Sequence, residues 1–430
     1  MPTKLHPASS QREDTTRSWW TPVASLLAAV LVTTLVACGG GGGGGSSAGV
    51  GTGGTGSFAV GTISGFGSII VNGVRYDDSR ATVVDDDDSS SSSSSLSIGQ
   101  VVEIRGSVNS DGVTGTASSI AYYAALKGPV TAVDVGAGTV TVFGQVVNVT
   151  ATTLFESVSG LSALAVGNVV EVYGLPDAGG AITATRIERE ATSIAAFGGD
   201  FRIRGLVSSL VATSPGQRFS VGSVTVQTDN ATQIEGTIAD GVFVRVRLDK
   251  TAIAVNTYTA KRVKVKNRVY ESGVNKAEVQ GLISGYTSPS AEFKVNGYPA
   301  QLGTSVTYER GAVGDLANDV RIEAKGVVTN GVLVISKVEF DDESNAGGSD
   351  GSSAPFEFNG VATCSPTPCG SPTGSILVRG VTVKYDTATT RFNDGLTTAN
   401  LSGARVEVKA VAQSGSVGST LLATRIKRDN

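Results

Sequence analysis

The stretch Gly61–Tyr76, GTISGFGSIIVNGVRY, decides the fold, because it joins a short glycine-containing strand to a β-hairpin. Its Asn72-Gly73 pair lies between apolar residues, and both residue types tolerate the positive φ angles of a type I′ turn. Phe293–Tyr298, FKVNGY, repeats this hairpin signal. The equivalent turn position in other parts of the chain has less favourable residues: Phe143-Gly144, Gly222-Ser223 and Arg379-Gly380.

The stretch belongs to a unit that recurs five times. Each unit opens with a short strand that contains glycine, at Gly61, Gly128, Gly205, Gly281 and Gly360, so the period is about 67 to 79 residues. A period of this size indicates a domain rather than a solenoid turn. A later strand alternates apolar and charged residues, at Val101–Ile104, Val169–Val172, Val242–Val246, Val320–Glu323 and Val406–Val408. A closing strand follows, at Ala117–Ile120, Ala184–Ile187, Ala260–Val263, Ile335–Val338 and Ala423–Ile426.

Five to seven strands in about 65 residues bury enough apolar surface only if the sheet curls onto itself. We therefore predict an all-β chain: a tandem array of five small OB-like β-barrel domains after a disordered N-terminal signal and a Gly-rich tether. One continuous β-solenoid is the structural alternative. The expected segments are a signal peptide at 1–37, a tether at 38–57, β-domains at 58–124, 125–190, 201–270 and 277–340, a linker at 341–354 and a fifth β-domain at 355–430.

The first unit carries a family resemblance. Gly61–Tyr76, followed by Ile98–Glu103 (IGQVVE), resembles the bacterial domain-of-unknown-function family numbered 5666. Units two and four match moderately, whereas three and five depart, because Arg245 replaces a glutamate in the third and the fifth carries a cysteine insertion. The resemblance implies a repeated, exported, often lipid-anchored β domain. It supplies no activity and no catalytic residues.

The N-terminus has the pattern of a secretory signal. A polar lead with Lys4, Arg12 and Arg17 precedes the apolar run Pro22–Ala37, which ends at Cys38. Small residues before a cysteine match the bacterial lipobox, so we predict that Cys38 is lipidated. An ordinary cleaved signal or a single anchor helix is the alternative. Because the next residue is glycine rather than aspartate, we expect a lipid-anchored protein of the cell envelope, in the outer membrane.

Composition excludes several classes of function. His6 is the only histidine, so the exported chain has no imidazole base for the nucleophile-like Gly347–Gly351 pattern around Ser349. Gly51–Gly56 spells a dinucleotide motif, but it lies in the tether without a flanking strand or helix. The net charge of −4 is unfavourable for nucleic acid. We expect no cofactor, no catalytic residue and no nucleic-acid partner.

Cysteines and carboxylates give little evidence for a metal site. Cys364 and Cys369 flank a four-residue loop, and export makes a disulfide between them plausible, whereas two thiols alone do not complete a zinc site. The run Asp85–Asp88 could attract Ca²⁺, but it lacks the spacing of a calcium loop, and Asp341–Glu343 resembles a linker. A glutamate recurs at one strand position, as Glu103, Glu171, Glu323 and Glu407. Glycoside hydrolysis needs two facing carboxylates, so a wet strand face is the simpler interpretation.

The third unit carries a stripe of positive charge. Arg262, Lys264, Lys266 and Arg268 alternate and should point the same way, while two further pairs, Arg202 with Arg204 and Arg245 with Arg247, repeat the alternation on neighbouring strands. We expect this surface to bind an anionic ligand such as acidic polysaccharide, lipid headgroups or another acidic unit. The alternative is a solvated face whose lysines block edge-to-edge aggregation.

Three functions follow in order. The first is a non-enzymatic binding array for an envelope polysaccharide or another envelope protein, in which several weak modules gain avidity. The second is a structural spacer or assembly factor of the outer membrane. The third is a carboxylate-dependent hydrolase. Both tryptophans, Trp19 and Trp20, lie in the signal, so glycan binding through stacked aromatic rings would depend on tyrosines. The candidates are Tyr122, Tyr123, Tyr286 and Tyr308.

Overall fold

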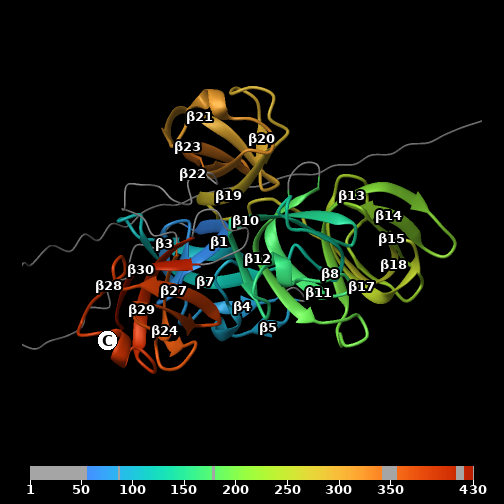
Figure 1. Cartoon of the computed structure of the whole chain (residues 1–430). Helices are drawn as coiled ribbons and strands as arrows, with labels where there is room; N and C mark the ends of the chain where they lie inside the picture. Colours follow the sequence, from blue (N-terminus) through green and yellow to red (C-terminus); the bar gives the residue numbers. More distant parts are fainter. Residues whose placement is uncertain (1–55, 86–87, 177–179, 341–355, 413–420, 430) are drawn as a thin grey trace, which may run out of the picture. The chain divides into compact units, whose positions relative to one another are not determined.

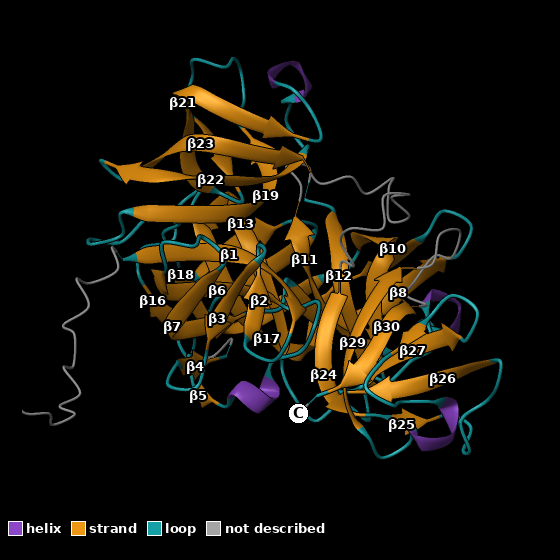
Figure 2. Ribbon diagram, turned by 90° about the vertical axis from the view of Figure 1, so that its left-hand side faces the viewer, coloured by secondary structure: helices purple, strands orange, loops and turns teal. Residues whose placement is uncertain are grey.

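The structure is a computed structural model that describes residues 56–85, 88–176, 180–340, 356–412 and 421–429. In these residues the chain consists mainly of strands, with short 3-10 turns between them (Figure 2). The turns are η1 (Ser93–Ser95), η2 (Leu161–Ala163), η3 (Val313–Asp315) and η5 (Thr398–Asn400). None of the helices formed by the described residues has the length and apolarity needed to cross a bilayer. The all-β prediction is confirmed.

The second unit shows the topology most simply. Its strands are β8 (Leu126–Asp134), β9 (Thr139–Val142), β10 (Gln145–Glu156), β11 (Val169–Pro176) and β12 (Ile182–Ala191). β8 pairs antiparallel with both β9 and β11, β9 pairs with β10, and β12 pairs antiparallel with β11 and parallel with β10. These pairings close a five-stranded ring, which is the Greek-key arrangement of an OB-like barrel.

The strand pairings of barrels 1 and 3, two of the units drawn in Figure 1, close rings in the same way. Barrel 1 comprises β1 (Ser57–Gly65), β2 (Ile69–Val71), β3 (Val74–Asp77), β4 (Thr82–Val84), β5 (Ser90–Ser91), β6 (Val101–Val108) and β7 (Thr114–Tyr122). Barrel 3 comprises β13 (Phe201–Ala212), β14 (Gln217–Val221), β15 (Val224–Gln227), β16 (Gln233–Glu235), β17 (Phe243–Ala254) and β18 (Thr257–Val265). In both, a parallel pairing joins the third strand to the last, β3 to β7 and β15 to β18.

Barrels 4 and 5 complete the array. Barrel 4 comprises β19 (Lys276–Ser284), β20 (Phe293–Val295), β21 (Tyr298–Glu309), β22 (Arg321–Thr329) and β23 (Val332–Phe340). Barrel 5 comprises β24 (Phe356–Val361), β25 (Thr363–Cys364), β26 (Thr373–Val378), β27 (Val381–Asp386), β28 (Arg391–Phe392), β29 (Arg405–Ala412) and β30 (Leu421–Arg428). Because each unit closes its own ring, the solenoid alternative is wrong and the tandem-barrel prediction is confirmed.

The predicted hairpin turns have the geometry that their sequences suggest. Asn72 and Gly73 have φ of 52° and 72°, and Asn296 and Gly297 have φ of 48° and 78°. Phe143 also adopts a positive φ of 55°, followed by Gly144 at 72°. A bulky side chain rarely enters this region. The ring closure of the barrel therefore imposes the same turn even where the local sequence disfavours it.

The core of each barrel comes from alternate residues of its strands. β29 and β22 alternate buried apolar residues with partly exposed charged ones, as period-two patterning predicts. In barrel 3, Phe201, Val244 and Val263 are fully buried on β13, β17 and β18. On each of these strands, the residues that alternate with the buried ones point outward. The hydrophobic pattern therefore determines which side chains lie on the barrel surface.

Candidate functional site

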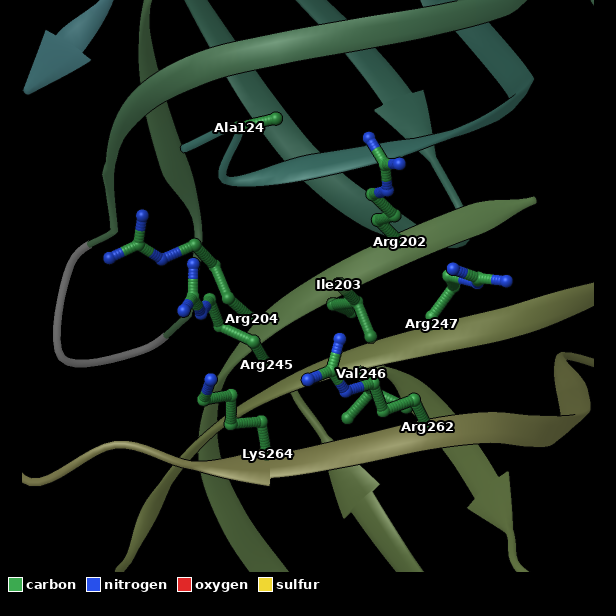
Figure 3. A pocket seen from close by; sticks show the side chains of 9 residues that line it. All are labelled: Ala124, Arg202, Ile203, Arg204, Arg245, Val246, Arg247, Arg262 and Lys264. Atoms are coloured by element: carbon green, nitrogen blue, oxygen red, sulfur yellow. The ribbon is translucent and has the colours of Figure 1, made fainter. Parts of the chain in front are cut away.

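Barrel 3 presents two rows of cations on three adjacent strands. The register places Arg202 opposite Arg247 and Arg247 opposite Arg262. The second row is Arg204, Arg245 and Lys264, paired in the same way. We call these six residues the basic face; they surround a shallow hollow together with Ala124, Ile203 and Val246 (Figure 3). The prediction that the arginine pairs repeat on neighbouring strands of one domain matches this geometry.

Like charges that lie directly opposite each other destabilise a sheet, so the face needs nearby anions. Asp88 accepts from Arg245 Nη2 at 2.7 Å and also pairs with Lys264. Glu235 pairs with Arg262 and, at 3.2 Å, with Lys264. Burial alone would raise the pKa of Asp88, but the hydrogen bonds from Lys264 and Arg245 outweigh it and hold the pKa well below its usual range. The face is therefore held together by charge networks rather than by isolated pairs.

Aromatic rings orient two of the arginines. The Arg245 guanidinium carbon lies 4.1 Å from the ring centroid of Tyr123, and that of Arg204 lies 5.0 Å from the same ring. Arg204 also lies 5.3 Å from the Phe243 ring. Such contacts fix the guanidinium planes. Tyr123 is only 8% exposed and burial raises its pKa to about 12, so this tyrosine supports arginines instead of offering a stacking platform to a glycan.

The three remaining tyrosines lie in barrels 1 and 4. Tyr122 shares a hydrogen bond with Ser91 at 3.1 Å between their oxygens. Tyr286 packs edge-on against Phe293 in barrel 4, where Tyr308 also lies, at the end of β21. The four tyrosines considered for glycan stacking therefore do not form one aromatic surface.

Arg245 occupies the strand position at which the other barrels carry glutamate. The register pairs Val60 with Glu103, Lys127 with Glu171, Gln280 with Glu323 and Asn359 with Glu407, and it pairs Arg204 with Arg245. Lys127 Nζ lies 2.9 Å from Glu171, and Glu407 accepts from Arg425 and Lys427 at 2.9 and 2.8 Å. Those glutamates take part in ion pairs of their own barrels. Barrel 3 has the opposite charge at this position.

The predicted four-residue stripe does not continue to its end. β18 ends at Val265, so Lys266 and Arg268 lie beyond the strand. Lys266 Nζ is 3.5 Å from Asp88. Arg268 stacks on Phe243, with 4.0 Å between guanidinium carbon and ring centroid, and it donates to the backbone and side-chain oxygens of Asn296. The prediction that all four cations alternate along one strand is therefore wrong for Lys266 and Arg268, because β18 ends before them. That these two residues bind an anionic ligand stays a prediction.

The cysteines fall in two places. Cys364 and Cys369 are joined by a disulfide, with Cys364 buried at the end of β25. Cys38 lies outside the described residues, so its lipidation stays a prediction.

Sequence reasoning missed one acidic cluster in barrel 2. Carboxylate oxygens of Glu171, Glu188 and Glu190 lie within 4.8 Å of one another. Lys127 Nζ lies 2.9 Å from Glu171 and 3.2 Å from Glu190, so a protein ammonium already supplies positive charge there. The three glutamates are visible in the sequence, but they lie on two strands, β11 and β12, and the sequence does not give the register that brings them together. We assign no metal to this cluster.

Comparison with known proteins places the repeat in a family. The model of the family "Domain of unknown function (DUF5666)" matches residues 59–121, 127–188, 204–264 and 370–427, more than half of the chain. The chain belongs to the DUF5666 family. The matched regions include units three and five, although Arg245 and the cysteine insertion depart from the family pattern. Barrel 4, residues 276–340, lies outside the four matched regions, yet its strands close the same ring as those of the matched units.

Other comparisons add little to the DUF5666 assignment. A search of curated proteins found no match. One similar solved structure is the crystal structure of a multidomain protein with nucleic acid binding domains from Streptococcus pneumoniae TIGR4, at 6% identity, covering 52% of this chain and 72% of that one. Its TM-score is 0.13, so the likeness carries no argument.

Proposed function

We propose that the chain is a non-enzymatic binding array, anchored in the bacterial outer membrane through Cys38, whose third barrel binds an anionic polysaccharide of the envelope. The observation that carries the proposal is the basic face: six cations in two facing rows, on a barrel that replaces the recurrent glutamate with Arg245. Residues 201–270 contain 11 lysines and arginines against four aspartates and glutamates, in a chain of net charge −4. Positive charge is therefore concentrated in barrel 3, where it can attract an anionic ligand.

The geometry suits a polymer better than a small enzyme substrate. Arginine forks match carboxylate and other oxyanions bidentately, and two parallel rows offer several such contacts along one chain. Arg247, Arg262 and Lys264 keep 39%, 27% and 24% of their side chains exposed, so a ligand can reach them. The carboxylates Glu171 and Glu407 engage cations of their own barrels, which favours binding over carboxylate catalysis.

The test is binding of the full-length chain to polygalacturonate, with neutral dextran as a negative probe. Four partly exposed cations are changed together, as Arg247→Gln, Arg262→Gln, Lys264→Gln and Lys266→Gln, and Arg268 is left intact because it packs against Asn296. Each lost pair contributes about 0.2–1 kcal/mol, so four together contribute roughly 1–4 kcal/mol, and we expect affinity at low salt to fall about tenfold or more. Raising the salt should weaken the unmodified chain more than the variant.

A matched variant controls for net charge. Arg218→Gln, Lys294→Gln, Lys384→Gln and Arg391→Gln remove the same four charges from exposed positions outside the basic face, and this variant should bind within about twofold of the unmodified chain. Equal losses in both variants, or no binding of polygalacturonate by the unmodified chain, would contradict the proposal. Tighter binding of a single-stranded oligonucleotide than of polygalacturonate would point to a different class of partner.

A further inference from the structure

A second hollow opens beside the basic face and belongs to barrel 3 alone. It has a volume of about 500 Å³, within the range of ligand sites. Arg247 and Arg262, which stand opposite each other on β17 and β18, line both this hollow and the one in Figure 3. The two arginines therefore connect the basic face to a second, larger space.

The lining of this hollow is mixed in charge. Asp229 and Asp249 line it together with the two arginines and Lys261. Lys261 Nζ lies 3.5 Å from Asp249. Hydrogen bonding from the backbone N–H of Thr251 lowers the pKa of Asp249, so this carboxylate is charged at neutral pH. Arginines attract a carboxylate, whereas the aspartates accept hydrogen bonds from hydroxyls and repel further negative charge.

The hollow also has polar amide and apolar parts. Gln233 lies opposite Arg262 in the register of β16 and β18, and its amide can donate and accept. Ile253 is 57% exposed and contributes an apolar surface of the kind that packs against the C–H face of a sugar ring. A ligand that satisfies this lining carries one carboxylate, several hydroxyls and an apolar face.

We infer that this hollow binds a single hexuronate unit of the polysaccharide, with its carboxylate on Arg247 and Arg262 and its hydroxyls on Asp229, Asp249 and Gln233. The inference rests on the proposed function, because it assumes that the basic face receives the rest of an anionic polymer. It adds the chemical class of the ligand. A phosphomonoester or sulfate ester polymer would bind the arginines but would not use the aspartates.

The test fills the hollow without changing charge. Ala231→Tyr and Thr251→Tyr each place a ring in it from exposed positions, and Ala212→Tyr, at an exposed position on β13 that is not part of this lining, is the control. Binding of tetragalacturonate, maltotetraose and dextran sulfate to the full-length chain is measured by calorimetry. We expect either filling variant to weaken tetragalacturonate binding at least tenfold and dextran sulfate binding less than twofold, with Ala212→Tyr unchanged and maltotetraose not bound.

The outcomes separate the two proposals. If the unmodified chain binds neither anion, the proposed function fails. If it binds dextran sulfate but not tetragalacturonate, or if both filling variants keep full tetragalacturonate affinity, the basic face remains a polyanion site and the hexuronate assignment is overturned. Two filling variants on different segments guard against misfolding, and circular dichroism of each confirms that the barrels are intact.

Discussion

Replacing Gly128 with alanine is expected to destabilise barrel 2 by about 1–3 kcal/mol, the range for overpacking a closed core. A β-carbon at Gly128 would overlap the ring of Phe143. That ring is fully buried, and its residue is held at a positive φ in the tight turn between β9 and β10. Neither the ring nor the turn can move without opening the barrel, so the added methyl group cannot be accommodated.

The measurement is hydrogen exchange of the amides in β11 and β12, because the unfolding of a chain of several barrels is not one two-state transition. Gly136→Ala is the control. Gly136 lies in an exposed turn of the same barrel, and a β-carbon there would make an ordinary van der Waals contact of 3.5 Å with Asp134 Oδ1. This control should change stability by less than about 0.5 kcal/mol. Equal exchange in the two variants would contradict the close contact between β8 at Gly128 and the turn at Phe143.

The recurrent opening glycine was visible in the sequence, but its cause was not. At Gly61 a β-carbon would overlap Asn72, and at Gly281 it would overlap Asn296. Asn72 donates to the backbone oxygen of Val60, which ties the hairpin turn to the first strand. The glycine and the turn lie 11 residues apart in the first unit and 15 in the fourth, yet they are the two sides of one contact. A linear pattern records both without showing that they touch.

Local patterns predicted what local physics determines. Alternation fixed the outward-facing residues of β17 and β18, and Asn72-Gly73 fixed a turn. Ring closure depends instead on the parallel pairing of Tyr76 with Gly115, which no period reveals. The same holds for the site. The sequence indicated that Arg202, Arg245 and Arg262 lie on charged strands, but only the register aligns them in rows. Only the structure shows that β18 ends at Val265, before Lys266 and Arg268.

Barrel 4 is expected to lose stability as the pH rises from about 5 to 9, and Glu323→Gln is expected to abolish that loss. Burial, together with the neighbouring carboxylate of Glu278, raises the pKa of Glu323 to about 9. Glu278 is itself buried and lies 3.0 Å from Lys325 Nζ, so Glu323 is the member of the pair that keeps a proton. An unfolded glutamate titrates near 4.5. Between these two values the folded barrel binds one proton more than the unfolded chain.

The sign of the effect follows from that difference in bound protons. Stability is fully present below pH 4.5 and falls as the pH rises toward 9, with a slope of up to about 1.4 kcal/mol per pH unit. Glutamine mimics the protonated carboxyl and does not titrate, so the variant should be more stable than the unmodified chain at pH 8 and similar at pH 4. Urea unfolding of barrel 4, read by pulsed hydrogen exchange at one fixed labelling pH, measures the difference.

The equivalent position in barrel 5 provides the control, because Glu407 sits at the same register but faces cations. It accepts from Arg425 Nη2 at 2.9 Å and from Lys427 Nζ at 2.8 Å. Glu407→Gln removes two ion pairs instead of one unfavourable carboxylate, and it should give barrel 5 no gain at pH 8. A gain in both barrels would mean that any glutamine stabilises this strand. No gain in barrel 4 would mean that Glu323 is charged in the folded chain.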